Sequence, residues 1–335
     1  QDIMVCQALG VMGSYFEGIG EIDSMIVCYE KALDSAMRIR HPEHVARIST
    51  FYAGYFIRMG RLGLGHELLH EAMERCREYG GRSLEMRYIC TAMDFYAELG
   101  CWDIVAGLLD RTHVLRRLHS DDRYLKYFDT DLFSRRADEI EARFEMARGD
   151  VEGAEAIFER IEKAHLKSFH PADQVKLYHY WASGMVDNGL PQRAVDICRK
   201  GIEYSRRYSF DDWEARLLLL EARAEYSRGN IRASESILLQ FDGVAESLSE
   251  SLQEERIFRD GLMGRVELAS GNIEEAFACL ISALDGLVLY VTSTEASAHS
   301  YLLFEKFENL KDLFHDLVAY SPSLGYGVAV SYTHL

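Results

Sequence analysis

Proline is scarce in this sequence, with four among 335 residues. Proline breaks helices, whereas alanine, leucine, glutamate and arginine, all abundant here, favour them. Seven cysteines are present without any C-x-x-C pair, a pattern that gives neither a disulfide framework nor a thiolate zinc site. A reducing cytoplasm is therefore the predicted compartment.

Basic charge is also in short supply. Lysine and arginine number 37 against 54 aspartates and glutamates, and the net charge is −17. This balance argues against general nucleic-acid affinity, because phosphate contacts need clustered cations. No apolar run approaches the length that spans a bilayer, and no signal peptide is visible. The sequence therefore predicts neither a nucleic-acid nor a membrane partner.

The common catalytic motifs are missing as well. There is no G-x-x-x-x-G-K-[ST] phosphate loop and no G-x-S-x-G nucleophile elbow. Carboxylates are scattered over helical surface positions, and no pair is marked by two environments that would separate its pKa values. Trp102, Trp181 and Trp213 are interpreted as packing residues. These absences predict a protein without catalytic activity or cofactor.

What the sequence does contain is a repeated glycine turn. The stretch from Gly264 to Leu284 predicts a helix that ends near Ser270, a turn at Gly271-Asn272 and a second helix. Turns of this kind recur at Gly20, Gly60, Gly100, Gly149, Gly189, Gly229 and Gly271, spaced by 40, 40, 49, 40, 40 and 42 residues. A period of this size predicts a solenoid of helical pairs.

Residue size follows the same period. Seven residues before each glycine stand Gly13, Ala53, Met93, Ala142, Ala182, Ala222 and Gly264. Five residues after it stand Met25, Gly65, Val105, Ala154, Ala194, Ser234 and Ala276. Nine residues after it stand Tyr29, Leu69, Leu109, Phe158, Cys198, Leu238 and Leu280. The first two sets are mostly small and predict where helices cross, and the larger third set fills the gap to a neighbour.

These motifs resemble the tetratricopeptide repeat (TPR) family. The best matches are Gly13…Phe16…Gly20…Tyr29, Gly149–Ala154 and Gly271–Ala276. The resemblance implies an all-α, right-handed solenoid of seven to eight antiparallel helical pairs over residues 1–320. The repeats exceed the usual 34 residues, as in kinesin light chains and many bacterial regulators. The 49-residue step across His119–Tyr127 predicts a longer helix or an insertion in the fourth repeat.

The C-terminal region departs from the period. A degenerate last pair is predicted over residues 293–320, with helices Thr294–Phe307 and Leu310–Tyr320, where a cap would protect the stacked core. Residues 321–335 form a non-repeat tail that ends in a sequence resembling translated sequencing adapter. This tail, together with a chain that begins at Gln1, predicts a fragment of a longer protein.

A basic stripe is the main candidate binding site. In the TPR family the first helix of each pair lines a concave groove. Five consecutive repeats place a cation thirteen residues before the turn glycine, and others lie six residues before it. The predicted groove residues are Arg47, Arg87, Arg136, Arg143, Lys176, Arg216, Arg223 and Arg265, with apolar contacts from Tyr226 and Phe258. Arginine suits carboxylates, so we expect a protein or peptide partner of acidic character. The alternative is that these arginines form salt bridges with neighbouring repeats, for instance to Asp94 or Glu139.

Two other functions remain open. His66-Glu67-Leu68-Leu69-His70 fits the H-E-x-x-H pattern of zinc hydrolases, with Glu85 or Glu98 as an imaginable third ligand; two surface histidines on a repeat helix are the favoured interpretation. The segment Tyr301–Asn309 resembles the last repeat of bacterial sensor arrays. The chain could thus be the sensor half of a larger signalling protein, such as a diguanylate cyclase or a transcriptional regulator.

Overall fold

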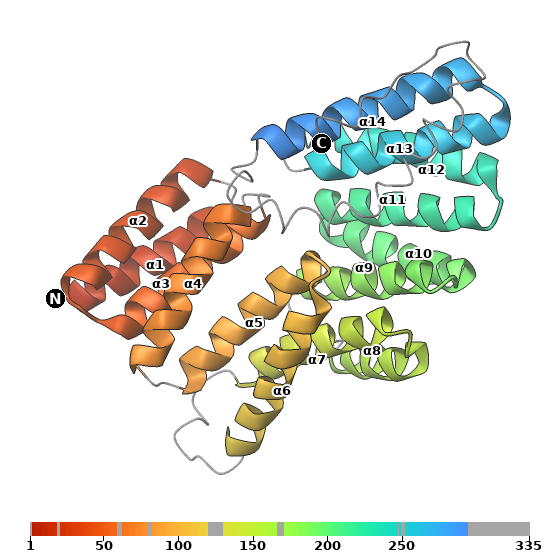
Figure 1. Cartoon of the computed structure of the whole chain (residues 1–335). Coiled ribbons are helices and arrows are strands. Elements are labelled where there is room, and N and C mark those ends of the chain that lie inside the picture. Colours follow the sequence, from red (N-terminus) through yellow and green to blue (C-terminus); the bar gives the residue numbers. More distant parts are fainter. Residues whose placement is uncertain are drawn as a thin grey trace, which may run out of the picture. The chain divides into compact units, whose positions relative to one another are not determined.

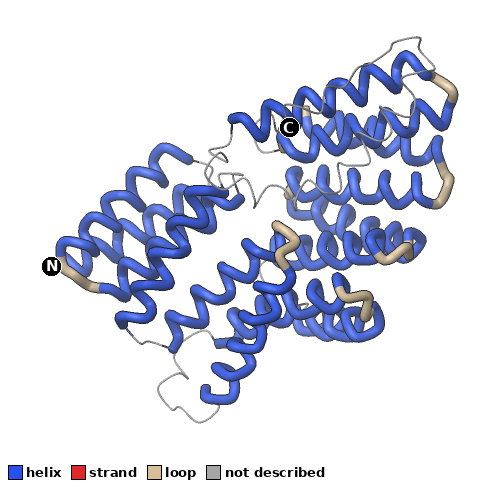
Figure 2. Tube along the Cα trace, in the orientation of Figure 1, coloured by secondary structure: helices blue, strands red, loops and turns tan. Residues whose placement is uncertain are grey.

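The computed structural model describes residues 2–18, 21–58, 62–79, 82–119, 130–165, 171–246, 248 and 252–293. These residues form fourteen α-helices and no strand (Figures 1 and 2). The predicted insertion at 119–127, both helices of the last pair and the tail lie outside the described residues, apart from His119. No helix among the described residues is both long and apolar enough to cross a bilayer.

The helices alternate between first and second members of a pair. The first helices are α1 (Asp2–Gly18), α3 (Pro42–Arg58), α5 (Arg82–Glu98), α7 (Thr130–Ala147), α9 (Pro171–Asp187), α11 (Asp211–Ser227) and α13 (Gln253–Ser270). The second helices are α2 (Ile22–Arg38), α4 (Leu62–Tyr79), α6 (Trp102–His119), α8 (Val151–His165), α10 (Pro191–Tyr208), α12 (Ile231–Ala245) and α14 (Ile273–Ser293). The predicted all-α repeat of seven pairs is confirmed.

The glycine turns are built alike. Gly100, Gly149, Gly189, Gly229 and Gly271 all have positive φ, between 71° and 87°, where glycine is favoured. In each turn the residue after the glycine donates its backbone N–H to the carbonyl five residues earlier, at 2.8–2.9 Å. This bond closes the end of the first helix. The predicted conformation of Gly271 is therefore confirmed.

The size pattern marks the core. Every residue of the three sets defined by distance from the turn glycine is buried. In the seventh pair a Cβ atom added to Gly264 would lie 2.7 Å from Leu280 Cγ and 3.1 Å from the Ala276 carbonyl oxygen. In the first pair a Cβ atom on Gly13 would lie 2.7 Å from the ring of Tyr29. Small residues therefore permit the close helix crossing that the pattern predicts.

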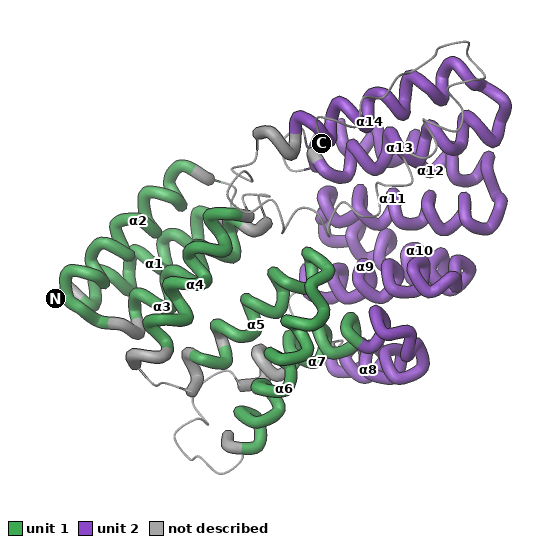
Figure 3. Tube along the Cα trace, in the orientation of Figure 1, with its two compact units in different colours: residues 1–144, 294–305 green, residues 145–293, 306–335 purple. Residues whose placement is uncertain are grey.

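The chain divides into two compact units (Figure 3). Up to Phe144 the described residues belong to unit 1, and Glu145–Ser293 belong to unit 2. Within unit 1, α3 packs against α5; within unit 2, α9 packs against α11 and α11 against α13. First helices of successive pairs are thus neighbours within each unit.

The cysteines serve as small core residues. All seven are free thiols, and five of them are buried. Burial raises the pKa of the Cys76 thiol to about 11 and that of the Cys198 thiol well above its ordinary value. A thiol held in its neutral form is a poor nucleophile, so these two residues contribute packing rather than chemistry.

Candidate protein-binding surface

The predicted groove residues all lie on first helices. Arg47 is on α3, Arg87 on α5, Arg136 and Arg143 on α7, Lys176 on α9, Arg216, Arg223 and Tyr226 on α11, and Phe258 and Arg265 on α13. The side chain of Arg87 lies outside the description, whereas Arg47 is half-buried. Because first helices pack side by side within each unit, these positions form one series in each unit.

In unit 1 the stripe is joined by ion pairs. Arg136 Nη2 lies 2.8 Å from Asp94 Oδ2, and Arg143 Nη2 donates to Glu98 Oε1 at 2.9 Å. Arg143 also lies 4.0 Å from Asp94, and its side chain is only 8% exposed. Both arginines therefore link α7 to α5. A salt bridge between neighbouring repeats through Asp94 is the alternative to ligand binding given in the sequence analysis.

The ion pair of Arg143 has a counterpart in unit 2. Arg223 Nη2 lies 3.0 Å from Asp187 Oδ1. Arg143 and Arg223 each stand six residues before their turn glycine, and Glu98 and Asp187 each stand two residues before the preceding one. The same two positions of the repeat therefore form an ion pair between successive first helices in both units. These two arginines are accounted for, at least in part, by stacking between neighbouring pairs.

A second arrangement in unit 2 combines cations with an aromatic ring. Lys176 Nζ lies 5.7 Å and Arg216 Cζ 4.9 Å from the ring centroid of Trp213. The His179 ring meets the same indole edge-on at 5.6 Å, and Arg216 Nε lies 3.0 Å from Glu255 Oε1. We call these five residues the Trp213 cluster. All of them are half-buried, so their charges act where water is partly excluded.

Trp181 and Trp213 both act as packing residues, as the sequence predicts, but in different places. Trp181 does pack in the core, 5% exposed and stacked on Phe158. Trp213, by contrast, is half-buried on the first-helix face together with the cations. Its position three residues before Arg216, one helical turn away, would have placed both on one side of α11.

Tyr226, Phe258 and Arg265 complete the predicted stripe on the last two first helices. Tyr226 lies in the last turn of α11, and Phe258 and Arg265 lie on α13. All three are half-buried. Their partial exposure is compatible with the predicted apolar contacts, and their role in binding stays a prediction.

Buried carboxylates hold α11 on its other side. Glu214, Glu221 and Glu225 are 7%, 6% and 3% exposed, so the interpretation of the carboxylates as scattered surface residues is wrong for these three. Arg206 and Arg199 of α10 donate to Glu214 and Glu221, each at 2.8 Å. These bonds fix the helix that carries Trp213 and Arg216.

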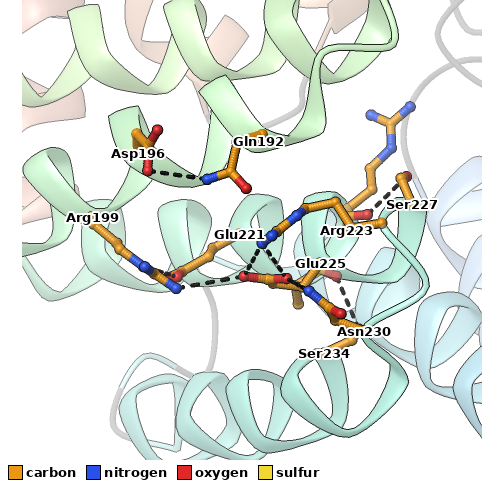
Figure 4. A network of polar contacts seen from close by, with 11 residues as sticks. Gln192, Asp196, Arg199, Glu221, Arg223, Glu225, Ser227, Asn230 and Ser234 are labelled. Atoms are coloured by element: carbon orange, nitrogen blue, oxygen red, sulfur yellow. Dashed lines mark hydrogen bonds and ion pairs between the residues drawn. The ribbon is translucent and has the colours of Figure 1, made fainter.

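Glu225 is the most enclosed of these acids. It accepts hydrogen bonds from Arg228 Nη1 at 2.8 and 2.9 Å and from Asn230 Nδ2 at 2.6 Å. Arg199 Nη2 reaches it at 3.5 Å from α10 (Figure 4). Asn272 and Glu267 repeat the turn-crossing bond in the next pair, at 2.7 Å. The network thus ties the turn after α11 to α11 itself, and Arg199 ties α11 to α10.

The H-E-x-x-H histidines do not meet a third ligand. His66 is half-buried, with its ring 6.0 Å from that of Phe95, and His70 is exposed. Glu85 accepts two hydrogen bonds from Arg111, at 2.7 and 3.0 Å, and Glu98 accepts one from Arg143. Over the described part of the chain no group of three or more histidine, cysteine or acidic side chains could hold a metal. A catalytic zinc site usually has three protein ligands, so the described histidines do not support one.

Comparison with known proteins gives the fold. No protein-family model matches the sequence, and no curated protein does. Among solved structures, a signal transduction ATPase with numerous domains (STAND) and a tetratricopeptide repeat sensor, from Pyrococcus horikoshii, aligns with 97% of this chain at a TM-score of 0.60 and 11% identity. A putative kinesin light chain protein of TPR-like repeats from Podosopora anserina aligns with 62% of this chain and 97% of its own, at a TM-score of 0.46 and 17% identity.

The first of these likenesses defines the class of fold. The chain is a TPR-like array of helical repeats, as the sequence predicts. It spans about half (48%) of the length of the STAND protein.

Proposed function

We propose that this chain is a non-catalytic repeat protein that binds an acidic, extended segment of a partner protein on its first-helix face. The Trp213 cluster is the observation that carries the proposal. Lys176 and Arg216 come from successive first helices and lie against one indole ring, within 5.7 and 4.9 Å. The TPR resemblance assigns this face to the concave side of the array.

The chemistry of the cluster supports an acidic ligand. Arginine offers paired donors to a carboxylate, and lysine adds a second charge beside it. Glu255 already contacts Arg216. A ligand carboxylate would share or replace that contact, which limits its contribution to the binding free energy. Apolar or aromatic ligand residues would pack on Trp213 and Phe258, and Arg223 and Arg265 continue the basic stripe. Such surfaces gain association rate and specificity from complementary charge.

A peptide of alternating glutamate and aromatic residues is expected to bind with a dissociation constant of about 1–100 µM. Raising the ionic strength from about 0.05 M to about 0.5 M should weaken binding at least about tenfold, because the Debye length shortens. The double variant Lys176→Glu/Arg216→Glu should also bind at least about tenfold more weakly. Fluorescence anisotropy of the labelled peptide measures both effects.

The matched control reverses two charges elsewhere in unit 2. Lys163→Glu/Arg207→Glu makes the same change in net charge on second helices, where these side chains are 73% and 59% exposed. Peptide affinity should then fall by less than about threefold. Equal losses in the two double variants would show that binding follows net charge alone, and salt-independent affinity would contradict the electrostatic mechanism.

A second candidate function is that of a sensor module in a larger signalling protein. Its support is the alignment of 97% of this chain with a protein described as carrying a TPR sensor. The intact reading frame in the source genome tests whether the chain is part of such a signalling protein. We expect an attached signalling domain if the chain is a sensor; a natural stop codon directly after Tyr320, with no such domain upstream, would refute this candidate.

A further inference from the structure

The Trp213 cluster contains a carboxylate of the chain itself. Glu255 lies in the first turn of α13, and its Oε1 is 3.0 Å from Arg216 Nε. The side chains of Glu255 and Arg216 are only 17% and 28% exposed, so water screens their attraction less than at an open surface. The chain therefore supplies, at Arg216, the same kind of group that the proposed ligand would bring.

Stacking of the helices does not require a carboxylate at this position. Glu255 stands sixteen residues before its turn glycine, and Trp213 stands at the same distance before Gly229. There the cation of the preceding first helix, Lys176, lies 5.7 Å from a neutral indole ring. The same position of the repeat thus holds an aromatic ring in one pair and an acid in the next, so the acid is not a general requirement of the fold.

The direction of the ion pair distinguishes it from those of unit 1. Arg136 matches Arg216 in distance from the turn glycine, and it pairs with Asp94 of the preceding first helix at 2.8 Å. The residue of α9 that corresponds to Asp94 is Ser183, which is uncharged. Arg216 instead meets a carboxylate of the following first helix. Its ion pair with Glu255 therefore lies outside the register that joins α5 to α7.

A ligand carboxylate and Glu255 compete for the same donors. A guanidinium binds a carboxylate most strongly through two N–H groups, and Nε of Arg216 is already close to Glu255. A ligand acid at Arg216 must displace Glu255 or share the guanidinium with it, and two carboxylates at one arginine repel each other. The free energy of the pair between Arg216 and Glu255 is therefore subtracted from the free energy of ligand binding.

We propose that Glu255 is an intramolecular competitor, which lowers the affinity of the Trp213 cluster for acidic ligands. The inference rests on the proposed function, because it concerns the same site. A ligand whose only strong contact is with Arg216 gains nothing by exchanging one carboxylate for another. Binding then requires further contacts with Lys176 or Trp213, so the competitor adds specificity by penalising ligands that lack them.

Anisotropy measurements with the glutamate and aromatic peptide described above, on the 335-residue chain, test the proposal. Glu255→Gln preserves the size of the side chain and removes its charge, and it should raise the affinity at least about fivefold. The control Glu274→Gln removes an exposed acid from the first turn of α14. Its change in net charge is the same, and the affinity should rise by less than about twofold.

A shorter acid separates competition at Arg216 from the charge of Glu255 alone. Glu255→Asp keeps the negative charge but withdraws it from Arg216 by one methylene group, and it should raise the affinity at least about twofold. This variant also replaces Glu255→Gln if the latter loses its helical circular dichroism. An affinity equal to or below that of the parent chain would contradict competition for the guanidinium.

The outcomes separate this inference from the proposed function. If the parent chain binds the peptide and Glu255→Gln binds it no more tightly, the competitor is refuted and the proposed function stands. If neither chain binds the peptide up to about 1 mM, both are refuted. Equal gains in Glu255→Gln and Glu274→Gln would assign the effect to net charge and would also refute the competitor. Binding that is measurable only in Glu255→Gln would support both.

Discussion

Phe158→Ala is expected to lower the free energy of unfolding of unit 2 by about 3–5 kcal/mol. The side chain is fully buried on α8, and its ring stacks on Trp181 of α9 with a centroid distance of 5.5 Å and an interplanar angle of 9°. The loss combines the transfer of a large aromatic group with the cavity that it leaves, and stacked rings add about 0.5–1.5 kcal/mol. Urea unfolding followed by circular dichroism measures the change.

The same experiment reports how the pairs depend on each other. In a stacked array, stability is the sum of each repeat and its contacts with its nearest neighbours. Phe158 belongs to the contact between α8 and α9, so a second, earlier transition is expected in the variant. Leu239→Ala, on an exposed position of α12, should change the unfolding free energy by less than about 0.5 kcal/mol. A loss below about 1 kcal/mol for Phe158→Ala would show that this interface relaxes around the cavity.

The sequence was sufficient to predict the repeat. Steric fit at a helix crossing depends on a few positions at fixed distances from the turn, so Gly264, Ala276 and Leu280 could be assigned by counting from Gly271. The turn itself needs positive φ at one residue, and glycine reports that need directly. Both constraints are local, and both are met in the structure.

The polar contacts could not be predicted in the same way. Arg143 and Glu98 are 45 residues apart, and nothing in the helical period distinguishes an arginine that pairs with its neighbour from one that faces a ligand. Glu221 and Glu225 look like solvated residues of an acidic helix, yet both are buried because α10 supplies Arg199. Such pairings depend on which helices meet and on side-chain length, and composition specifies neither.

The ion pairs between repeats reduce the number of cations that are candidates for ligand binding. Arg143 and Arg223 repeat one ion-pair register, which a stacking role explains. Lys176 and Arg216 lie instead against Trp213, an arrangement that the stacking register does not require, although Arg216 is also paired with Glu255 of α13. We therefore expect substitutions in the Trp213 cluster to weaken binding most, and substitutions of Arg143 and Arg223 to weaken it less.

Glu225→Ala is expected to lower the free energy of unfolding of unit 2 by about 2–3 kcal/mol. The carboxylate is 3% exposed and accepts from Arg228, Asn230 and Arg199, and hydrogen bonds to charged groups contribute about 1.5–3 kcal/mol. Arg199 is 62% exposed, so it regains water when its acceptor is lost, which keeps the cost below that of a fully buried ion pair. Chemical unfolding of unit 2 provides the measurement.

The control removes a carboxylate that is paired but exposed. Glu203 accepts from Arg207 at 3.0 Å with a side chain that is 76% exposed, and Glu203→Ala should change stability by at most about 0.5 kcal/mol. A double-mutant cycle with Arg228→Ala should show a coupling of about 1–2 kcal/mol with Glu225. Equal losses of stability in the two glutamate variants would mean that the burial of Glu225 does not increase its contribution to the free energy of unfolding. A coupling near zero would assign the cost of Glu225→Ala to lost packing at the turn rather than to the bonds from Arg228.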